Sequence, residues 1–308
     1  MPNPPSLASL ARLPSQDPAF FDREYNNRAL VPDHPADIAR WAELSRQVRE
    51  RTGWLEDLSY ADAVPGPHAD AERLDYFPAD ADPEGSAPPL LVFLHGGYWR
   101  ALDKRDHSLV ANALPGCGVS VAVVDYALAP AVTVAAILLQ AVRSVAWLYR
   151  QSERLGHDRA RIFVAGHSVG GNMAAMMLAT HWPGLAGDLP AGLVKGAVSV
   201  SGLHELEPLR RAPFLADLRL TEQDVARMSP ARLLPATAAP LVTAVGELES
   251  GEYHRQTALL RAAWPANVSV PGAAHVPMPG RHHFSVVDAF AERDGALLRA
   301  VRRMIGVD

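Results

Sequence analysis

Ser168 is the first residue whose setting predicts chemistry, because it lies at the centre of the pentapeptide Gly166-His167-Ser168-Val169-Gly170. An apolar run, Arg161–Ala165, precedes the pentapeptide, and a helix-like stretch, Gly171–Leu178, follows it. A strand, a sharp turn and a helix in this order form a nucleophile elbow, in which glycines permit the tight turn. The helix N-terminus then faces the point where negative charge develops in a reaction. The pattern predicts that Ser168 is a nucleophile.

A second motif, His95-Gly96-Gly97-Tyr98-Trp99, begins 73 residues before Ser168, directly after the apolar run Leu90–Leu94. Glycine allows bare backbone to approach a substrate closely. We therefore expect the amides of Gly96 and Gly97, together with that of Val169, to form an oxyanion hole. Tyr98 and Trp99 are expected to line an apolar pocket that accepts aromatic groups, with packing under the loop as the alternative.

A serine nucleophile also needs a base and an acid, which follow it in the order serine, acid, histidine in this type of site. Two adjacent histidines, His282 and His283, precede an expected helix that starts at Phe284, and we favour His283 as the base. Two glutamates, Glu247 and Glu249, follow the expected strand at 241–245. The spacing from Gly246 favours Glu249 as the acid that orients the imidazole, and Glu247 remains open.

The composition excludes several classes of function. The chain has 308 residues, 48% hydrophobic and 20% charged, with a net charge of −5, which is typical of a globular protein. Without a basic run or about 20 uninterrupted apolar residues, we expect neither nucleic acid nor a membrane as a partner. The first 22 residues lack the apolar core of a secretory signal, which predicts a cytoplasmic protein. Cys117 is the only cysteine, so no intrachain disulfide can form.

Motifs for metals and cofactors are missing from the sequence. There is no His-Glu-x-x-His motif, no paired cysteine motif and no Gly-x-Gly-x-x-Gly loop after a strand. The adjacent His282 and His283 cannot both face one metal from a strand. We therefore expect no metal and no cofactor.

The elements that must position these residues alternate between strand and helix. Residues 17–51 and 132–155 have helical spacing, as do 253–264 and 284–305. Expected strands occupy 72–77, 90–94, 120–126, 161–165, 195–200, 241–245 and 268–270. This alternation predicts an α/β fold with a mostly parallel sheet covered on both faces. We expect a single domain over 1–308, with an N-terminal helical extension at 1–60 and a small helical lid at 203–240, where an insertion separates two strands.

The motifs resemble those of a known group of α/β-hydrolases, the serine-dependent arylformamidases or kynurenine formamidases. The resemblance covers roughly Tyr25 to the C-terminus. It is carried by His95-Gly96-Gly97-Tyr98-Trp99, by Asp125-Tyr126-x-Leu128-Ala129-Pro130, by Ser201-Gly202-Leu203-x-Glu205-Leu206-Glu207-Pro208-Leu209, by Leu220-Thr221-Glu222-x-x-Val225-Ala226-x-x-Ser229-Pro230, and by Glu249-Ser250-x-Glu252-Tyr253-His254-Arg255-Gln256.

The resemblance implies an α/β-hydrolase fold with Ser168 as nucleophile, His283 as base and an acid at Glu249, where the family usually has aspartate. It implies hydrolysis of aryl formamides such as N-formyl-kynurenine, or of aryl esters with small acyl groups. The substrate would be a small-molecule ester or formamide. A general short-chain carboxylesterase is the alternative, and a non-catalytic ligand-binding protein on the same fold is a further one. The oligomeric state is not readable from the sequence.

Overall fold

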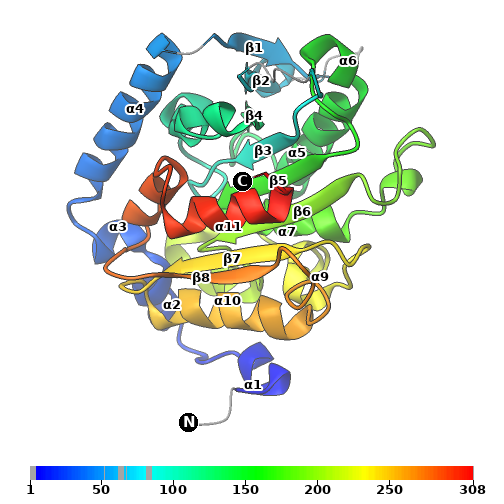
Figure 1. Ribbon diagram of the computed structural model, residues 1–308. Helices are drawn as coiled ribbons and strands as arrows, with labels where there is room; N and C mark the ends of the chain where they lie inside the picture. Colours follow the sequence, from blue (N-terminus) through cyan, green and yellow to red (C-terminus); the bar gives the residue numbers. More distant parts are fainter. Residues whose placement is uncertain (1–4, 52, 62–65, 67, 81–84, 308) are drawn as a thin grey trace.

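A single sheet of eight strands forms the centre of the molecule in the computed structural model, which describes all residues except 1–4, 52, 62–65, 67, 81–84 and 308 (Figure 1). The strand order is β1-β2-β4-β3-β5-β6-β7-β8; β2 is antiparallel to both of its neighbours, and β3 to β8 are parallel. The mostly parallel sheet is therefore confirmed. The strands are β1 (Leu55–Ser59), β2 (Arg73–Phe77), β3 (Leu90–Leu94), β4 (Ser120–Val124), β5 (Ile162–His167), β6 (Val194–Val200), β7 (Leu241–Gly246) and β8 (Ala274–Met278).

Helices cover both faces of the sheet, as the continuous apolar strands require. Alternate residues of β3 belong to two separate core clusters, Leu90, Val92 and Leu94 to one and Leu91 and Phe93 to the other. Side chains of α5, α7 and α10 complete the first cluster, and those of α4 and α11 complete the second. The α-helices are α1 (Leu7–Ala11), α2 (Pro18–Tyr25), α3 (Asn27–Leu30), α4 (His34–Arg51), α5 (Val134–Arg150), α6 (Ser152–Leu155), α7 (Val169–Ala179), α8 (Glu207–Arg211), α9 (Glu222–Met228), α10 (Gly251–Ala263) and α11 (Ala296–Ile305).

The register of the central strands brings the two glycine-containing motifs together. In the parallel pair of β3 and β5, Leu94 lies opposite Gly166. The chain that leaves β3 therefore enters its loop beside the chain that leaves β5. Because parallel strands end at the same edge of the sheet, the loop that begins at His95 and the turn that contains Ser168 are neighbours.

Two expectations for the sheet are wrong. The final strand is β8 and not 268–270, which lies in a turn after α10. The amide of Asn267 donates to the carbonyl oxygens of Thr237 and Ala239, at 2.8 and 2.7 Å, and holds this turn at the start of β7. The strand β1 was not expected, and it falls inside the predicted helical extension at 1–60. Its residues are mostly exposed, so no apolar run indicates it.

The expected helix over 17–51 is divided into α2, α3 and α4. Asn26 separates the first two, and its side chain accepts a hydrogen bond from the Ala29 N–H at 3.4 Å as the N-cap of α3. Similarly, the stretch expected as one helix from 284 to 305 is a 3-10 helix, Ser285–Phe290, followed by α11.

The segment between β6 and β7 consists of short helical pieces. It contains α8, α9 and the 3-10 helices Pro213–Leu218 and Pro230–Arg232. Its function as a lid stays a prediction.

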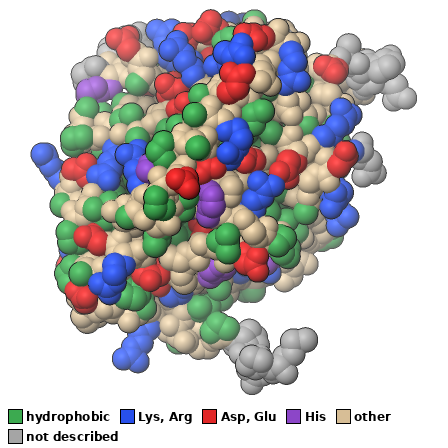
Figure 2. Space-filling view, turned by 90° about the vertical axis from the view of Figure 1, so that its left-hand side faces the viewer, with side chains coloured by type: hydrophobic (Ala, Val, Ile, Leu, Met, Phe, Trp, Pro, Cys, Tyr) green, Lys and Arg blue, Asp and Glu red, His purple; other side chains and the backbone are tan. Residues whose placement is uncertain are grey.

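The surface drawn in Figure 2 carries charges of both signs, with Lys and Arg side chains interspersed among Asp and Glu. Within the described part of the chain, no helix is both long enough and apolar enough to cross a membrane.

Candidate active site

Ser168 lies in the tight turn between β5 and α7, with φ 57° and ψ −121°. Its N–H donates to the carbonyl oxygen of Val200 at 2.9 Å, which ties the turn to β6. Glycine is required at positions 166 and 170 because other backbone atoms lie very close to both. A Cβ atom at Gly166 would lie 2.1 Å from the Gly170 oxygen, and one at Gly170 would lie 1.9 Å from the Leu94 oxygen. The backbone is therefore held in an uncommon conformation that presents the serine at the apex, as expected for a nucleophile elbow.

The His-Gly-Gly loop passes directly beside this serine. A Cβ atom added to Gly96 would lie 3.3 Å from the Ser168 Cβ. Gly97 has φ +104°, a conformation that favours glycine. Among the described residues, no carbonyl oxygen accepts a hydrogen bond from the amide of Gly96 or Gly97. These two donors, with Val169 at the first position of α7, are placed near the serine as an oxyanion hole would require.

His283 and Glu249 form a direct pair. The Nδ1 atom of His283 lies 2.7 Å from Oε2 of Glu249, and their side chains are only 7% and 1% exposed. The second carboxylate oxygen accepts hydrogen bonds from the Ser201 hydroxyl at 2.5 Å and from the Gly246 N–H at 2.7 Å. These donors fix the carboxylate, and the carboxylate in turn orients the imidazole with Nε2 on the opposite side of the ring.

The two alternative residues point elsewhere. Glu247 is exposed and accepts a hydrogen bond from the Gly280 N–H at 2.8 Å. His282 accepts with its Nδ1 atom from the N–H groups of Phe284 and Ser285, at 3.3 and 3.2 Å. Of the four candidates, the structure brings together Glu249 and His283.

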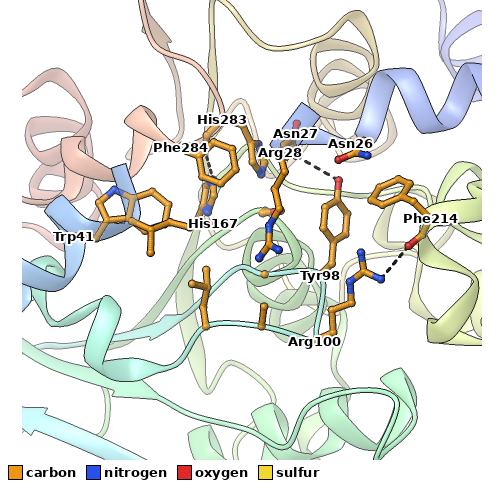
Figure 3. A pocket seen from close by; sticks show the side chains of 15 residues that line it. Asn26, Asn27, Arg28, Trp41, Tyr98, Arg100, His167, Phe214, His283 and Phe284 are labelled. Carbon is orange, nitrogen blue, oxygen red and sulfur yellow. Dashed lines mark hydrogen bonds between the residues drawn. The ribbon is translucent and has the colours of Figure 1, made fainter. Parts of the chain in front are cut away.

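Ser168 and His283 line one cavity of about 200 Å³ (Figure 3). Tyr98 is part of its wall, as expected. Trp99 is not among the described lining residues; its side chain is 1% exposed and packs in the core, which matches the alternative of packing under the loop. The lining residues are Asn26, Asn27, Arg28, Ile38, Trp41, Gly97, Tyr98, Arg100, Ala101, Leu102, His167, Ser168, Phe214, His283 and Phe284.

Several residues that support the site were not singled out from the sequence. Ser201 binds the carboxylate and has φ 52°. The Tyr253 ring lies 4.6 Å from the His283 ring, centroid to centroid. His167 holds the carbonyl oxygen of His283 through Nε2 at 2.8 Å, and burial lowers the pKa of His167 well below its usual range, so this imidazole is neutral. Ser201 and Tyr253 occur in the motifs that carry the family resemblance, but their roles depend on long-range contacts.

A partly buried carboxyl group, that of Asp125, lies near His95 of the His-Gly-Gly loop. Burial raises the pKa of Asp125 from 3.8 to about 7, although the Lys104 N–H donates to this carboxyl at 2.7 Å. The Nε2 atom of His95 lies 3.7 Å from Oδ1 of Asp125. This imidazole is neutral because burial lowers its pKa to about 3. Asp125 is therefore protonated in the folded protein below about pH 7.

This titration predicts a pH-dependent stability. Between about pH 4 and pH 7 the folded protein keeps a proton that the unfolded chain releases, so the free energy of unfolding falls as pH rises. The Asp125→Asn variant retains an acceptor for the Lys104 N–H and does not titrate. We expect its stability relative to wild type to increase by about 4 kcal/mol from pH 4 to pH 8, at ~1.4 kcal/mol for each unit by which the pKa is raised. Urea unfolding of both proteins across this range measures the difference, and a constant difference would contradict the assigned protonation.

Comparisons with known proteins were made for sequence and for structure. A family model described as alpha/beta hydrolase fold matches residues 91–244. A kynurenine formamidase of Danio rerio is 29% identical over 284 residues, 90% of this chain and 89% of the relative. A carboxylic ester hydrolase of Mycobacterium tuberculosis is 32% identical over 125 residues, 40% of this chain and 31% of the relative. A crystal structure from Silicibacter sp. TM1040, provisionally described as a thioesterase, superposes with a TM-score of 0.76 at 27% identity, over 91% of this chain and 98% of that one.

Proposed function

The chain belongs to the alpha/beta hydrolase fold family, and we propose that it is a serine hydrolase whose triad is Ser168, His283 and Glu249. The observation that carries this proposal is the 2.7 Å contact between His283 and Glu249 at a cavity that His283 lines together with Ser168. The serine is 2% exposed and lies at the carboxyl edge of the parallel strands, where α/β folds bind ligands.

The mechanism follows from the arrangement of the donors and acceptors. His283 takes the Ser168 hydroxyl proton at Nε2, while Nδ1–H remains bonded to Glu249, whose negative charge stabilises the imidazolium. The serine oxygen attacks the substrate carbonyl, and the amides of Gly96, Gly97 and Val169 hold the resulting oxyanion. Loss of one such donor typically costs ~3 kcal/mol of barrier.

The covalent intermediate then breaks down with the same groups. The imidazolium gives its proton to the leaving amine or alcohol as the tetrahedral carbon expels it, which leaves an acyl or formyl group on Ser168. Water attacks this ester after His283 takes one of its protons. The second tetrahedral intermediate releases the carboxylic acid, and the proton returns to the serine oxygen.

The proposed substrates are small acyl or formyl groups on an aromatic leaving group. A cavity of about 200 Å³ leaves room for a ring and a short acyl chain, and its wall contains the aromatic side chains of Trp41, Tyr98, Phe214 and Phe284. The extended match to a kynurenine formamidase favours an aryl formamide. The shorter match to a carboxylic ester hydrolase keeps a short-chain carboxylesterase as the second candidate.

A substrate panel tests this proposal. We expect kcat/KM for nitrophenyl acetate and butyrate to exceed that for the octanoate by about tenfold or more, because a chain that does not fit cannot share in binding of the transition state. N-formyl-kynurenine is measured beside the esters, by the absorbance of the released amine. A maximum at eight carbons or beyond would contradict the small-acyl proposal. If the enzyme hydrolyses the short esters but not N-formyl-kynurenine, the result supports the short-chain carboxylesterase and contradicts the formamidase.

A further inference from the structure

Two arginine side chains line the catalytic cavity, and they differ in their partners. Arg100 donates to an Asp217 carboxylate oxygen at 2.7 Å and to the Phe214 carbonyl oxygen at 2.9 Å. In the part of the chain that the structure describes, no carboxylate lies within 4.0 Å of the Arg28 guanidinium, and no hydrogen-bond acceptor is in reach of it. Among the described residues that line the cavity there is no aspartate or glutamate. Within the described part of the chain, the positive charge of Arg28 on this wall therefore has no acidic partner.

The backbone around Arg28 is fixed to the catalytic cavity. The Ser250 hydroxyl, adjacent to Glu249, donates to the carbonyl oxygen of Glu24 at 2.7 Å. The Tyr98 hydroxyl donates to the carbonyl oxygen of Tyr25 at 2.6 Å. The buried Asn27 amide donates to the Tyr253 hydroxyl at 2.7 Å. Side chains that belong to the site or to its wall thus hold the segment just before Arg28, which fixes the backbone from which the exposed Arg28 side chain extends.

Arg28 also lies on the outward side of the cavity. Its side chain is exposed, whereas Ser168 is buried at the deep end. Figure 3 shows the Arg28 side chain extending from α3 among the residues that line the cavity, near Tyr98 and His167. If the leaving group of a substrate bound at Ser168 faces the opening, it lies toward Arg28.

We propose that Arg28 binds a carboxylate on the aromatic leaving group, so that the enzyme prefers anionic aryl esters and aryl formamides to neutral ones. The inference rests on the proposed function, because it places the leaving group relative to Ser168. A guanidinium matches a carboxylate with two parallel N–H donors. The described residues that line the cavity offer no acidic side chain to bind a positively charged group of a substrate.

The experiment compares an anionic substrate, 4-acetoxybenzoate, with its neutral methyl ester. Because the methyl group also changes the size and the acidity of the leaving phenol, the ratio of the two kcat/KM values in each variant is judged against the wild-type ratio. We expect wild type to have a higher kcat/KM for the anion, and Arg28→Gln to lower the ratio of anion to ester by about tenfold, the size of one charge-assisted pair. Arg28→Lys keeps the charge but not the two parallel donors, so it restores part of the ratio. Added salt should reduce the preference of wild type.

The matched control is Arg23→Gln, which removes the same charge from an exposed arginine on α2, with a side chain 65% exposed and outside the lining of the cavity. This variant should keep the wild-type ratio. If Arg23→Gln lowers the ratio as much as Arg28→Gln, the effect is one of net charge and the proposed site is wrong. If wild type hydrolyses both substrates with equal kcat/KM, or Arg28→Gln leaves the ratio unchanged, the proposal is overturned.

A binding measurement separates this inference from the proposed catalysis. Saturation-transfer NMR with benzoate and benzamide needs no turnover. We expect benzoate to bind more tightly than benzamide to wild type, and Arg28→Gln to remove the difference. If neither ester is hydrolysed but this difference is present, the proposed function fails and the carboxylate site stands. Equal binding of benzoate by wild type and Arg28→Gln would overturn the site whatever the esterase activity.

Discussion

Replacing Ser168 by alanine is expected to lower kcat for a short aryl ester by about a millionfold, the effect seen when serine triads lose their nucleophile. No covalent intermediate can form without the hydroxyl, and only the oxyanion donors and substrate binding remain to assist water. The fold should persist, because the substitution removes only the hydroxyl oxygen. The conformation of the turn is set by the close backbone contacts of Gly166 and Gly170. Initial rates with purified protein at saturating nitrophenyl acetate measure the loss.

The control for this variant is Ser144→Ala. Ser144 is also a fully buried serine, on α5, and its hydroxyl donates to the Ala141 carbonyl oxygen and does not line the cavity. It should retain wild-type kcat. Circular dichroism of both variants checks the fold. If Ser168→Ala keeps more than a few per cent of the activity, the serine is not the nucleophile.

Glu249→Gln is expected to lower kcat by about 10³ to 10⁴, the range for triads in which the acid becomes an amide. The amide has no negative charge to stabilise the imidazolium, and its NH₂ group can favour the wrong imidazole tautomer. The Ser201 and Gly246 donors hold one oxygen of the side chain, so the NH₂ group would face Nδ1 of His283. Steady-state rates across pH measure this loss at constant protein concentration.

Glu247→Gln is the matched comparison, since it makes the same chemical change two residues away. The exposed Glu247 contacts the Gly280 amide and not the imidazole, so kcat should stay within about twofold of wild type. The opposite ranking of the two variants would remove Glu249 from the triad.

The central sheet was predictable because its strands are short, apolar and separated by clear turn and helix signals. The expected bounds of β3 agree with the structure, and β5 and β7 differ by two residues or fewer at their ends. The edge strand β1 was not predictable, because an exposed strand lacks the apolar run that indicates a buried one. The final strand was placed too early because Val268 and Val270 have strand propensity, while the Asn267 contacts fix a turn there.

The local part of the site was also readable from sequence. The elbow at Ser168 and the glycines after β3 depend on close backbone approach, which leaves a pattern in neighbouring residues. The choice between His282 and His283 depends on which imidazole faces a carboxylate 34 residues away in the chain, and adjacent identical residues give no signal for that. No signal in the sequence pointed to Arg28 either. The segment just before it is held at the cavity by long-range contacts from Tyr98, Ser250 and Tyr253.

The order of the triad along the chain has a consequence for biosynthesis. Ser168 and the glycine loop leave the ribosome before Glu249 and His283, and the wall that contains Asn27 is completed by Tyr253, 226 residues later. A nascent chain that ends before β8 therefore lacks His283, the base of the proposed triad, and the side of the cavity that contains His283 and Phe284. On the proposed triad, incomplete polypeptides are expected to lack hydrolytic activity even after their central strands have paired.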